Sequence, residues 1–315
     1  MKSFAAVFPG QGSQSVGMME SLVSKYPKAK EVFQQASDIM GLDTLTLTQN
    51  GPAEKLNQTT ITQPLLLTAG VACYEAFISE TGFKPTLMAG HSLGEYSALV
   101  AAGALTFQEA LKLVIARAEA MQSAVPIGEG AMAAVIGLTD EQIIDWCAQN
   151  TSNEALVSPV NFNAPGQVVI AGHAHAVEKA IPALKEVGAK RVLALPVSVP
   201  SHCALMHPAT QILKPKILKA PMTLPCVPVI QNVDASSHED VERIKGALIE
   251  QLSSPVRWVS SMHSLAQHGV QAIFEMGPGQ VLCGLQKRID KTVKAFALGS
   301  PEGINEALHW LNEDD

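Results

Sequence analysis

The sequence predicts an α/β protein with a mostly parallel sheet, interrupted by a small inserted unit. Short apolar runs alternate with helical segments along most of the 315 residues, which is typical of parallel strands joined by helices on both sides of a sheet. Between 128 and 197 the predicted order is β-α-β-β-α-β, that of a ferredoxin-like unit. Hydrophobic residues make up 47% of the chain and charged residues 16%, which suits a well-buried sheet. We therefore expect a large subdomain from 1–127 and 198–315 and a small one from 128–197.

The segment before the insertion alternates between strand and helix signals. A polar residue followed by proline is a typical helix start, so Thr62-Gln63-Pro64 predicts the beginning of a helix that ends near Gly82. Thr106 predicts the N-cap of the next long helix. The predicted strands are 3–8 and 86–89, and the predicted helices are 26–40, 62–82, 93–102 and 107–121.

Strand and helix signals also alternate in the insertion and in the segment that follows it. Thr139 and Gln142 have the spacing of a capping box, and Pro182 should bend or shorten its helix. The predicted strands of the insertion are 131–136, 155–161, 167–171 and 191–195, with helices at 139–149 and 174–187. The chain then returns with strands at 226–231, 270–275 and 293–298, and with helices at 239–252, 256–268, 280–288 and 301–311.

Gly90-His91-Ser92-Leu93-Gly94 lies between a predicted strand and a predicted helix. Strand, tight turn and helix with Gly-x-Ser-x-Gly on the turn is the pattern of a nucleophile elbow. The glycines let the backbone turn sharply and leave the Ser92 hydroxyl exposed. Leu93 begins the helix, so its backbone N–H is free and lies at the positive end of the helix dipole. The pattern predicts that Ser92 is a nucleophile with an oxyanion donor beside it.

A serine needs a base within hydrogen-bond reach, and His202 is the best candidate among nine histidines. It lies on a loop between two predicted structured segments, whereas the side chain of His91 should point away from its neighbour Ser92. No carboxylate can be assigned as the third member of a triad, so an amide or main-chain carbonyl could orient His202 instead. The histidine spacing does not match a zinc site.

Arg117 falls on the apolar face of its helix by the three- and four-residue spacing. An unpaired buried charge is costly, so this guanidinium needs a partner. Either an acidic side chain of the protein or the carboxylate of a ligand could supply it.

Charge and composition limit the partners. Lys and Arg number 22 against 29 Asp and Glu, a net charge of −7, which argues against nucleic acid. No run looks long enough to span a membrane. The five cysteines have no paired spacing and predict reduced thiols in a cytoplasmic protein. The glycine loop Gly10-Gln11-Gly12 could suggest dinucleotide binding, but Ser15 stands where the third glycine would be.

The chain resembles the malonyl-CoA:acyl carrier protein transacylases of bacterial type II fatty acid synthesis, nearly from end to end. The matching segments are Phe8-Pro9-Gly10-Gln11-Gly12-Ser13-Gln14, Thr62-Gln63-Pro64, Gly90-His91-Ser92-Leu93-Gly94-Glu95-Tyr96-Ser97, Ala116-Arg117, Gly130-Ala131-Met132-Ala133-Ala134-Val135-Ile136-Gly137, Asn161-Phe162-Asn163-Ala164-Pro165-Gly166-Gln167, Val199-Pro200-Ser201-His202, Asn232-Val233-Asp234, Gln251-Leu252, Pro255-Val256, Trp258 and Gly277-Pro278-Gly279. Two departures, Glu129 and Arg257, affect no residue expected in the site.

The resemblance implies an α/β-hydrolase-like large part and a two-step acyl transfer through a malonyl-serine. Ser92 would attack the thioester of malonyl-CoA, with His202 as base oriented by the main-chain carbonyl of Gln251. The backbone N–H groups of Gln11 and Leu93 would hold the oxyanion, and Arg117 would bind the malonyl carboxylate. The phosphopantetheine thiol of acyl carrier protein would accept the acyl group. No metal and no cofactor beyond the coenzyme A substrate is implied, and we expect a monomer.

Several alternatives remain open at this point. A serine thioesterase or esterase of the α/β-hydrolase type is the first, and a non-catalytic nucleotide-binding module is the second. The sequence does not decide between malonyl and methylmalonyl groups, nor between fatty acid and polyketide pathways. Carrier proteins are acidic, so docking needs a local positive patch, for which Lys190, Arg191, Lys287 and Arg288 are candidates.

Overall fold

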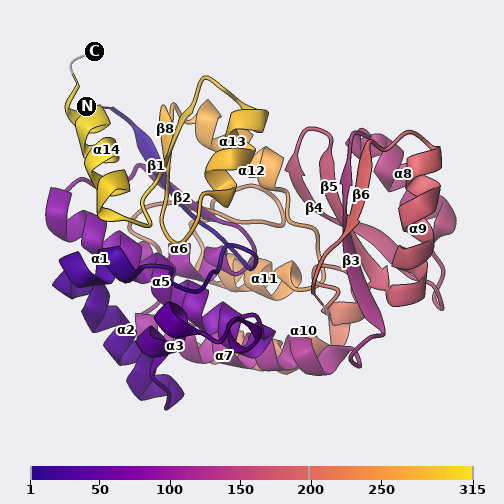
Figure 1. Ribbon diagram of the computed structural model, residues 1–315, viewed down its shortest axis with the longest axis horizontal. Coiled ribbons are helices and arrows are strands. Elements are labelled where there is room, and N and C mark those ends of the chain that lie inside the picture. The colour runs from indigo at the N-terminus through magenta and orange to yellow at the C-terminus, as the bar shows by residue number, and fades with distance from the viewer. Residues whose placement is uncertain (1, 198, 314–315) are drawn as a thin grey trace.

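Two sheets, one parallel and one antiparallel, organise the computed structural model, which describes residues 2–197 and 199–313. The parallel sheet has the strand order β7-β2-β1-β8-β9 and the antiparallel sheet the order β4-β5-β3-β6. Figure 1 shows the small sheet with α8 and α9 on the right and the larger body on the left, where both chain termini lie. The predicted fold class, an α/β protein with an inserted ferredoxin-like unit, is confirmed.

The parallel sheet is built from β1 (Phe4–Phe8), β2 (Leu87–Gly90), β7 (Val229–Ile230), β8 (Ala272–Glu275) and β9 (Lys294–Ala297). Every residue of β1 is buried, as expected for a central strand covered on both faces. Alternate residues of β1 enter two different cores: Phe4, Ala6 and Phe8 pack with helices on one face, and Ala5 and Val7 pack with helices on the other. The sheet is therefore covered on both sides.

The helices of the large part divide between these two faces. In Figure 1, α12 and α13 lie above the sheet and α5, α6 and α11 lie below it. The helices are α1 (Glu20–Lys25), α2 (Pro27–Met40), α3 (Thr44–Asn50), α4 (Ala53–Leu56), α5 (Thr59–Thr81), α6 (Gly94–Ala101), α7 (Phe107–Ala124), the 3₁₀ turn η1 (Ala204–Met206), α10 (His207–Lys219), α11 (Val241–Gln251), α12 (Trp258–Gln267), α13 (Val281–Ile289) and α14 (Pro301–Asn312).

The small sheet has the strand order of a ferredoxin-like unit. Its strands are β3 (Gly130–Ile136), β4 (Val157–Ala164), β5 (Gln167–His173) and β6 (Arg191–Ala194), and all three pairings are antiparallel. Helices α8 (Asp140–Asn150) and α9 (Ala174–Glu186) join them. The capping box of Thr139 and Gln142 is present, and Pro182 lies inside α9 without ending it.

Helix α5 differs from its prediction in two ways. It begins at Thr59, so Pro64 lies inside the helix and not in its first turn. The hydroxyl of Thr62 explains the error, because it donates to the carbonyl of Leu56 in the preceding helix and caps no helix of its own. By length and composition α5 could also cross a membrane, contrary to our expectation that no run was long enough, but 83% of its apolar window is buried inside the protein. It is the central helix of the core.

Three other elements depart from their predictions. Strand β7 is only two residues long, although the carbonyl of Pro228 just before it also accepts from the Met88 backbone N–H of β2 at 2.9 Å. The predictions missed α10, which has prolines at two positions, Pro208 in its first turn and Pro215 in its interior. They also missed the short helices α1, α3 and α4.

Candidate functional site

Ser92 lies on a tight turn between β2 and α6, held by close backbone contacts. Its φ of 53° is in the left-handed region, an unusual conformation for a serine. A Cβ added at Gly90 would lie 1.9 Å from the carbonyl carbon of Gly94, and one at Gly94 would lie 2.0 Å from the carbonyl oxygen of Phe8. Only glycine at both positions allows α6 to start this close to β1. The turn therefore presents Ser92 as the elbow pattern predicted.

His202 reaches Ser92 from the loop that follows β6. Its Nε2 lies 2.7 Å from the Ser92 hydroxyl, and its Nδ1 lies 2.8 Å from the main-chain carbonyl oxygen of Gln251. Because a carbonyl only accepts, Nδ1 carries the proton and Nε2 is left as the acceptor for the serine. Burial, and secondly the charge of Arg117, lower the pKa of His202 to about 3. The ring is therefore neutral at physiological pH.

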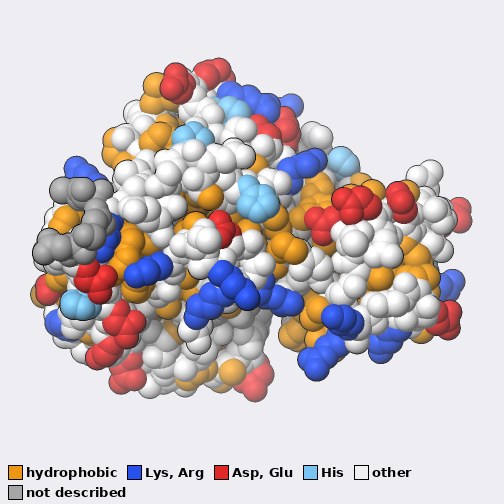
Figure 2. All heavy atoms as spheres, turned by 90° about the horizontal axis from the view of Figure 1, so that it is seen from above, with side chains coloured by type: hydrophobic (Ala, Val, Ile, Leu, Met, Phe, Trp, Pro, Cys, Tyr) orange, Lys and Arg blue, Asp and Glu red, His pale blue; other side chains and the backbone are white. Residues whose placement is uncertain are grey.

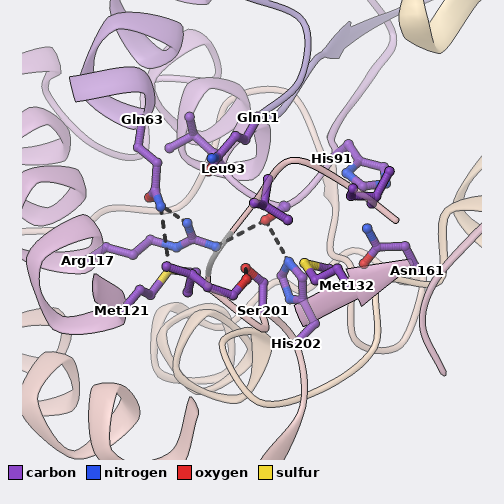
Figure 3. A pocket seen from close by; sticks show the side chains of 14 residues that line it. Gln11, Gln63, His91, Leu93, Arg117, Met121, Met132, Asn161, Ser201 and His202 are labelled. Atoms are coloured by element: carbon purple, nitrogen blue, oxygen red, sulfur yellow. Dashed lines mark hydrogen bonds between the residues drawn. The ribbon is translucent and has the colours of Figure 1, made fainter. Parts of the chain in front are cut away.

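Arg117 projects from α7 into the same place. Its Nη2 donates to the Ser92 hydroxyl at 3.1 Å and to the Gln251 side-chain oxygen at 3.0 Å, and its Nη1 donates to Gln63 at 2.6 Å. Arg117 is 1% exposed, and its buried Nε has no hydrogen-bond partner in the described part of the chain. No carboxylate of the described residues forms a salt bridge with it. Figure 3 shows Arg117 and His202 approaching one hydroxyl from different sides.

These groups border a cavity of about 100 Å³. Met121, Met132, Leu195 and Val199 supply apolar walls, and the lining also includes Gln11, Gln63, His91, Ser92, Leu93, Arg117, Asn161, Val197, Ser201 and His202. The small sheet contributes Met132 and Asn161, so the cavity lies between the two parts of the molecule. It is apolar apart from a few convergent polar groups, as small-molecule sites usually are.

Gln11 and Leu93 lie next to each other on one wall of the cavity (Figure 3). The loop of Gln11 can approach the elbow because a Cβ at Gly10 would lie 2.5 Å from the carbonyl oxygen of His91. Among the described residues, neither the Gln11 nor the Leu93 backbone N–H donates a hydrogen bond to a main-chain carbonyl. Leu93 is also the N-cap of α6, where free N–H groups are expected. Two backbone donors without a partner among the described residues therefore belong to residues that line the same cavity as Ser92.

Comparison with known proteins decides the family. The acyl transferase domain family matches residues 6–302. The chain belongs to the acyl transferase domain family. This acyl transferase is 52% identical to the malonyl CoA-acyl carrier protein transacylase of Salmonella typhimurium over 98% of its own length and 99% of the relative. The resemblance found in the sequence is thus confirmed.

Solved structures agree with this family. The acyl transferase matches the malonyl CoA-acyl carrier protein transacylase of Coxiella burnetii with a TM-score of 0.97 and 48% identity, covering 99% of this chain and 98% of that one. A second match is a malonyl-transacylase in complex with a type II polyketide acyl-carrier protein. Its TM-score is 0.95 and its identity 48%, with 98% of this chain and 99% of that one covered.

Beneath the cavity, this acyl transferase has a polar network that sequence reasoning missed. Glu95 is fully buried in the first turn of α6. Asn232 accepts from the Ser92 backbone N–H at 2.7 Å, donates to the Gly90 carbonyl at 2.6 Å, and donates from its own N–H to Glu95 at 2.9 Å. The only signal for Glu95 was its place in the Gly90–Ser97 segment. Asn232 also lay in a matching segment, but nothing local indicated its contact with the elbow.

Proposed function

We propose that this acyl transferase moves a malonyl group from coenzyme A to the phosphopantetheine thiol of acyl carrier protein, through a malonyl-serine at Ser92. The relatives over the full chain carry the name malonyl CoA-acyl carrier protein transacylase, and one structural neighbour is in complex with an acyl-carrier protein. The alternative of a serine thioesterase or esterase is not favoured by these relatives.

The observation that carries the proposal is the position of Arg117. A guanidinium in hydrogen-bond contact with the Ser92 hydroxyl, without a carboxylate in direct contact among the described residues, is expensive to bury, and a ligand carboxylate in direct contact would lower this cost. A malonyl group offers a carboxylate that the planar guanidinium binds in two parallel hydrogen bonds. Arg117 would then exchange its contact with Ser92 for one with the substrate.

The proposed first step is attack of the Ser92 oxygen on the thioester carbonyl, while Nε2 of His202 takes the serine proton. The Gln251 carbonyl keeps the imidazole oriented and stabilises the imidazolium that forms. The backbone N–H groups of Gln11 and Leu93 would hold the oxyanion, a contribution of about 3 kcal/mol per donor in comparable sites. The coenzyme A thiolate then leaves with the proton from His202. No metal or further cofactor takes part.

In the second step the pantetheine thiol repeats this sequence in reverse. Its proton passes to His202, its sulfur attacks the malonyl ester, and Ser92 leaves with the proton. We propose that the carrier approaches over Lys190, Arg191, Lys287 and Arg288, which are all exposed. Lys190 and Arg288 border the same groove, and Arg288 donates to Gln167 at the start of β5, so the two basic pairs lie close together.

Three further expectations belong to this proposal. We take 1–127 with 198–315 as one subdomain and 128–197 as the other, each with its own sheet. The five cysteines are free, which supports a reducing, cytoplasmic environment. We also propose that the protein acts as a monomer, which sedimentation at micromolar concentration would test.

An intact-mass measurement tests the proposed function. Incubation with malonyl-CoA should add one malonyl group to the wild-type protein and none to Ser92→Ala. The adduct should persist in buffer and disappear when pantetheine or carrier protein is added. Steady release of malonate without a thiol would instead identify a hydrolase. A parallel incubation with methylmalonyl-CoA shows which acyl group the cavity accepts.

A further inference from the structure

Glu95 is a buried carboxylate that the proposed mechanism does not use. It accepts hydrogen bonds from the Gln231 side chain at 3.2 Å, the Asn232 backbone at 2.9 Å and the Gln251 side chain at 3.1 Å. These donors come from the segment after β7 and from the end of α11. The carboxylate of Glu95 is thus fixed in position by three donors on two segments remote in sequence.

The side-chain amide of Gln251 lies between Glu95 and Arg117. Its nitrogen donates to Glu95 and, at 3.0 Å, to the Ser92 carbonyl, while its oxygen accepts from Arg117 at 3.0 Å. An ionised carboxylate and a carbonyl only accept, so the amide nitrogen must face them and the amide oxygen must face the guanidinium. One amide therefore links the buried anion to the buried cation.

We propose that Glu95 is the internal counter-charge of Arg117, relayed by Gln251, and that it controls how strongly the cavity takes up an acyl group bearing a carboxylate. This inference rests on the proposed malonyl transfer. Glu95 is a positioning residue, since it touches no reacting atom. Because Glu95 would act through the charge of Arg117, its effect should be specific to acyl groups that carry a charge.

The charges explain the direction of the effect. When Glu95 is ionised, its charge offsets that of Arg117, and a malonyl carboxylate brings a second negative charge into the same buried region. When Glu95 is neutral, Arg117 is left uncompensated and attracts the malonyl carboxylate more strongly. An acetyl group carries no charge, so its uptake should not depend on the charge of Glu95. Glu95 therefore limits malonyl uptake in its ionised form.

Both forms of Glu95 are accessible near neutral pH. Burial raises its pKa to about 7, against the opposing effects of its hydrogen bonds and of Arg117. The titratable groups that face Glu95 are Arg117 from α7 and Tyr96 from α6, with His202 beyond Gln251. Burial raises the pKa of Tyr96 to about 12 and lowers that of His202 to about 3, so neither changes charge between pH 6 and 8.

Glu95→Gln tests the proposal through the ratio of kcat/KM for malonyl-CoA to that for acetyl-CoA at pH 8. We expect this ratio to rise at least threefold. Glu95→Asp keeps the charge and should stay near the wild-type ratio, even if both rates fall. Glu275→Gln is a matched control: Glu275 is equally buried but caps the backbone N–H groups of Leu282 and Cys283 at the start of α13, so its ratio should be unchanged.

Two further measurements separate the charge effect from a structural one. In an Arg117→Ala background, Glu95→Gln should leave the ratio unchanged, because the interacting cation is gone. In the wild type, the ratio should increase as the pH falls from 8 to 6, and in Glu95→Gln it should stay flat. If Glu95→Gln does not fold, the wild-type pH series alone decides the question.

The outcomes distinguish the inference from the function on which it rests. An unchanged ratio in Glu95→Gln, or a wild-type ratio independent of pH, would overturn the role of Glu95 while malonylation of the wild type continues. A wild-type protein that malonyl-CoA does not acylate would overturn the proposed function itself.

Discussion

At the residue scale, the backbone of Ser92 and that of His202 share an unusual feature. Both have positive φ angles, 53° and 65°, and side chains other than glycine adopt this region only when the surroundings impose it. The Asn232 side chain binds the Ser92 backbone N–H and the Gly90 carbonyl, and the Leu252 carbonyl accepts from the His202 backbone N–H at 3.0 Å. The two side chains are thus directed at each other by the backbone itself.

The pKa of His202 leads to a prediction about pH. Because burial lowers it to about 3 from the ordinary 6.5, the neutral form that accepts the Ser92 proton persists well below pH 6. We expect kcat/KM for acetyl-CoA, a substrate without the carboxylate, to stay nearly constant from pH 8 to pH 5. Stopped-flow acylation across this range measures it. A half-maximal loss near pH 6.5 would show that His202 titrates like an exposed histidine.

Sequence patterns and the resemblance indicated several residues that border the cavity, Gln11, Ser92, Leu93, Arg117 and His202, but not the network beneath them. Ser92 follows from a local motif, and Arg117 from its place on an apolar helix face. Glu95 and Gln251 are 156 positions apart in the chain, and no local period or spacing connects them. The side-chain role of Gln251 was missed for the same reason, since the resemblance implied only its main-chain carbonyl.

At the scale of single elements, helices with a capping signal were predicted well. Thr106 and Thr139 cap α7 and α8 as their sequences indicated, because capping depends on residues within one turn. Helix α5 begins without any side-chain cap, and the Thr62 hydroxyl donates to the Leu56 carbonyl of α4 instead of capping a helix. Helix α10 was missed because two prolines concealed it, although its buried Ala209, Leu213 and Ile217 have helical spacing.

Removing the α8 cap should affect stability alone. The Thr139 hydroxyl accepts from the Gln142 backbone at 3.3 Å, and the Gln142 side chain accepts from the Thr139 backbone at 2.9 Å. Thr139→Ala should lower the free energy of unfolding by about 1 kcal/mol, as measured in urea. The rate of acylation by malonyl-CoA should not change, because α8 does not line the cavity. Gln149→Ala, exposed on the same helix, is the control, and equal losses in both variants would rule out the cap as the cause.

At the scale of the whole molecule, docking of an acidic carrier protein depends more on the local distribution of charge than on the net charge. The chain carries −7, and an acidic carrier would be repelled unless basic groups gather locally. In Figure 2, Lys and Arg side chains lie on both sides of the indentation between the larger and the smaller part of the molecule. A carrier held there would lie close to both parts.

Charge reversal tests the docking surface proposed above from the shared groove of Lys190 and Arg288. Changing Lys190, Arg191, Lys287 and Arg288 to Glu should raise the KM for carrier protein at least tenfold and leave acylation by malonyl-CoA unaffected, because attraction to the carrier is lost. The control changes Lys28, Lys30, Lys55 and Lys84 to Glu, which are also exposed and alter the net charge equally. If both quadruple variants show the same KM for carrier protein, only the net charge matters, and the proposal that the carrier docks on these four residues is wrong.

The strand order has a consequence for synthesis of the chain on the ribosome. Strands β1 and β2 are made first, yet their outer neighbours β8 and β7 come from the segment after the insertion. An emerging chain of 127 residues therefore carries Ser92 on a two-stranded ribbon whose outer edges are both unpaired, a state prone to association. It also lacks His202 and Gln251. The nucleophile consequently stays inert until nearly the whole polypeptide has been released, and a truncated product should be both inactive and poorly soluble.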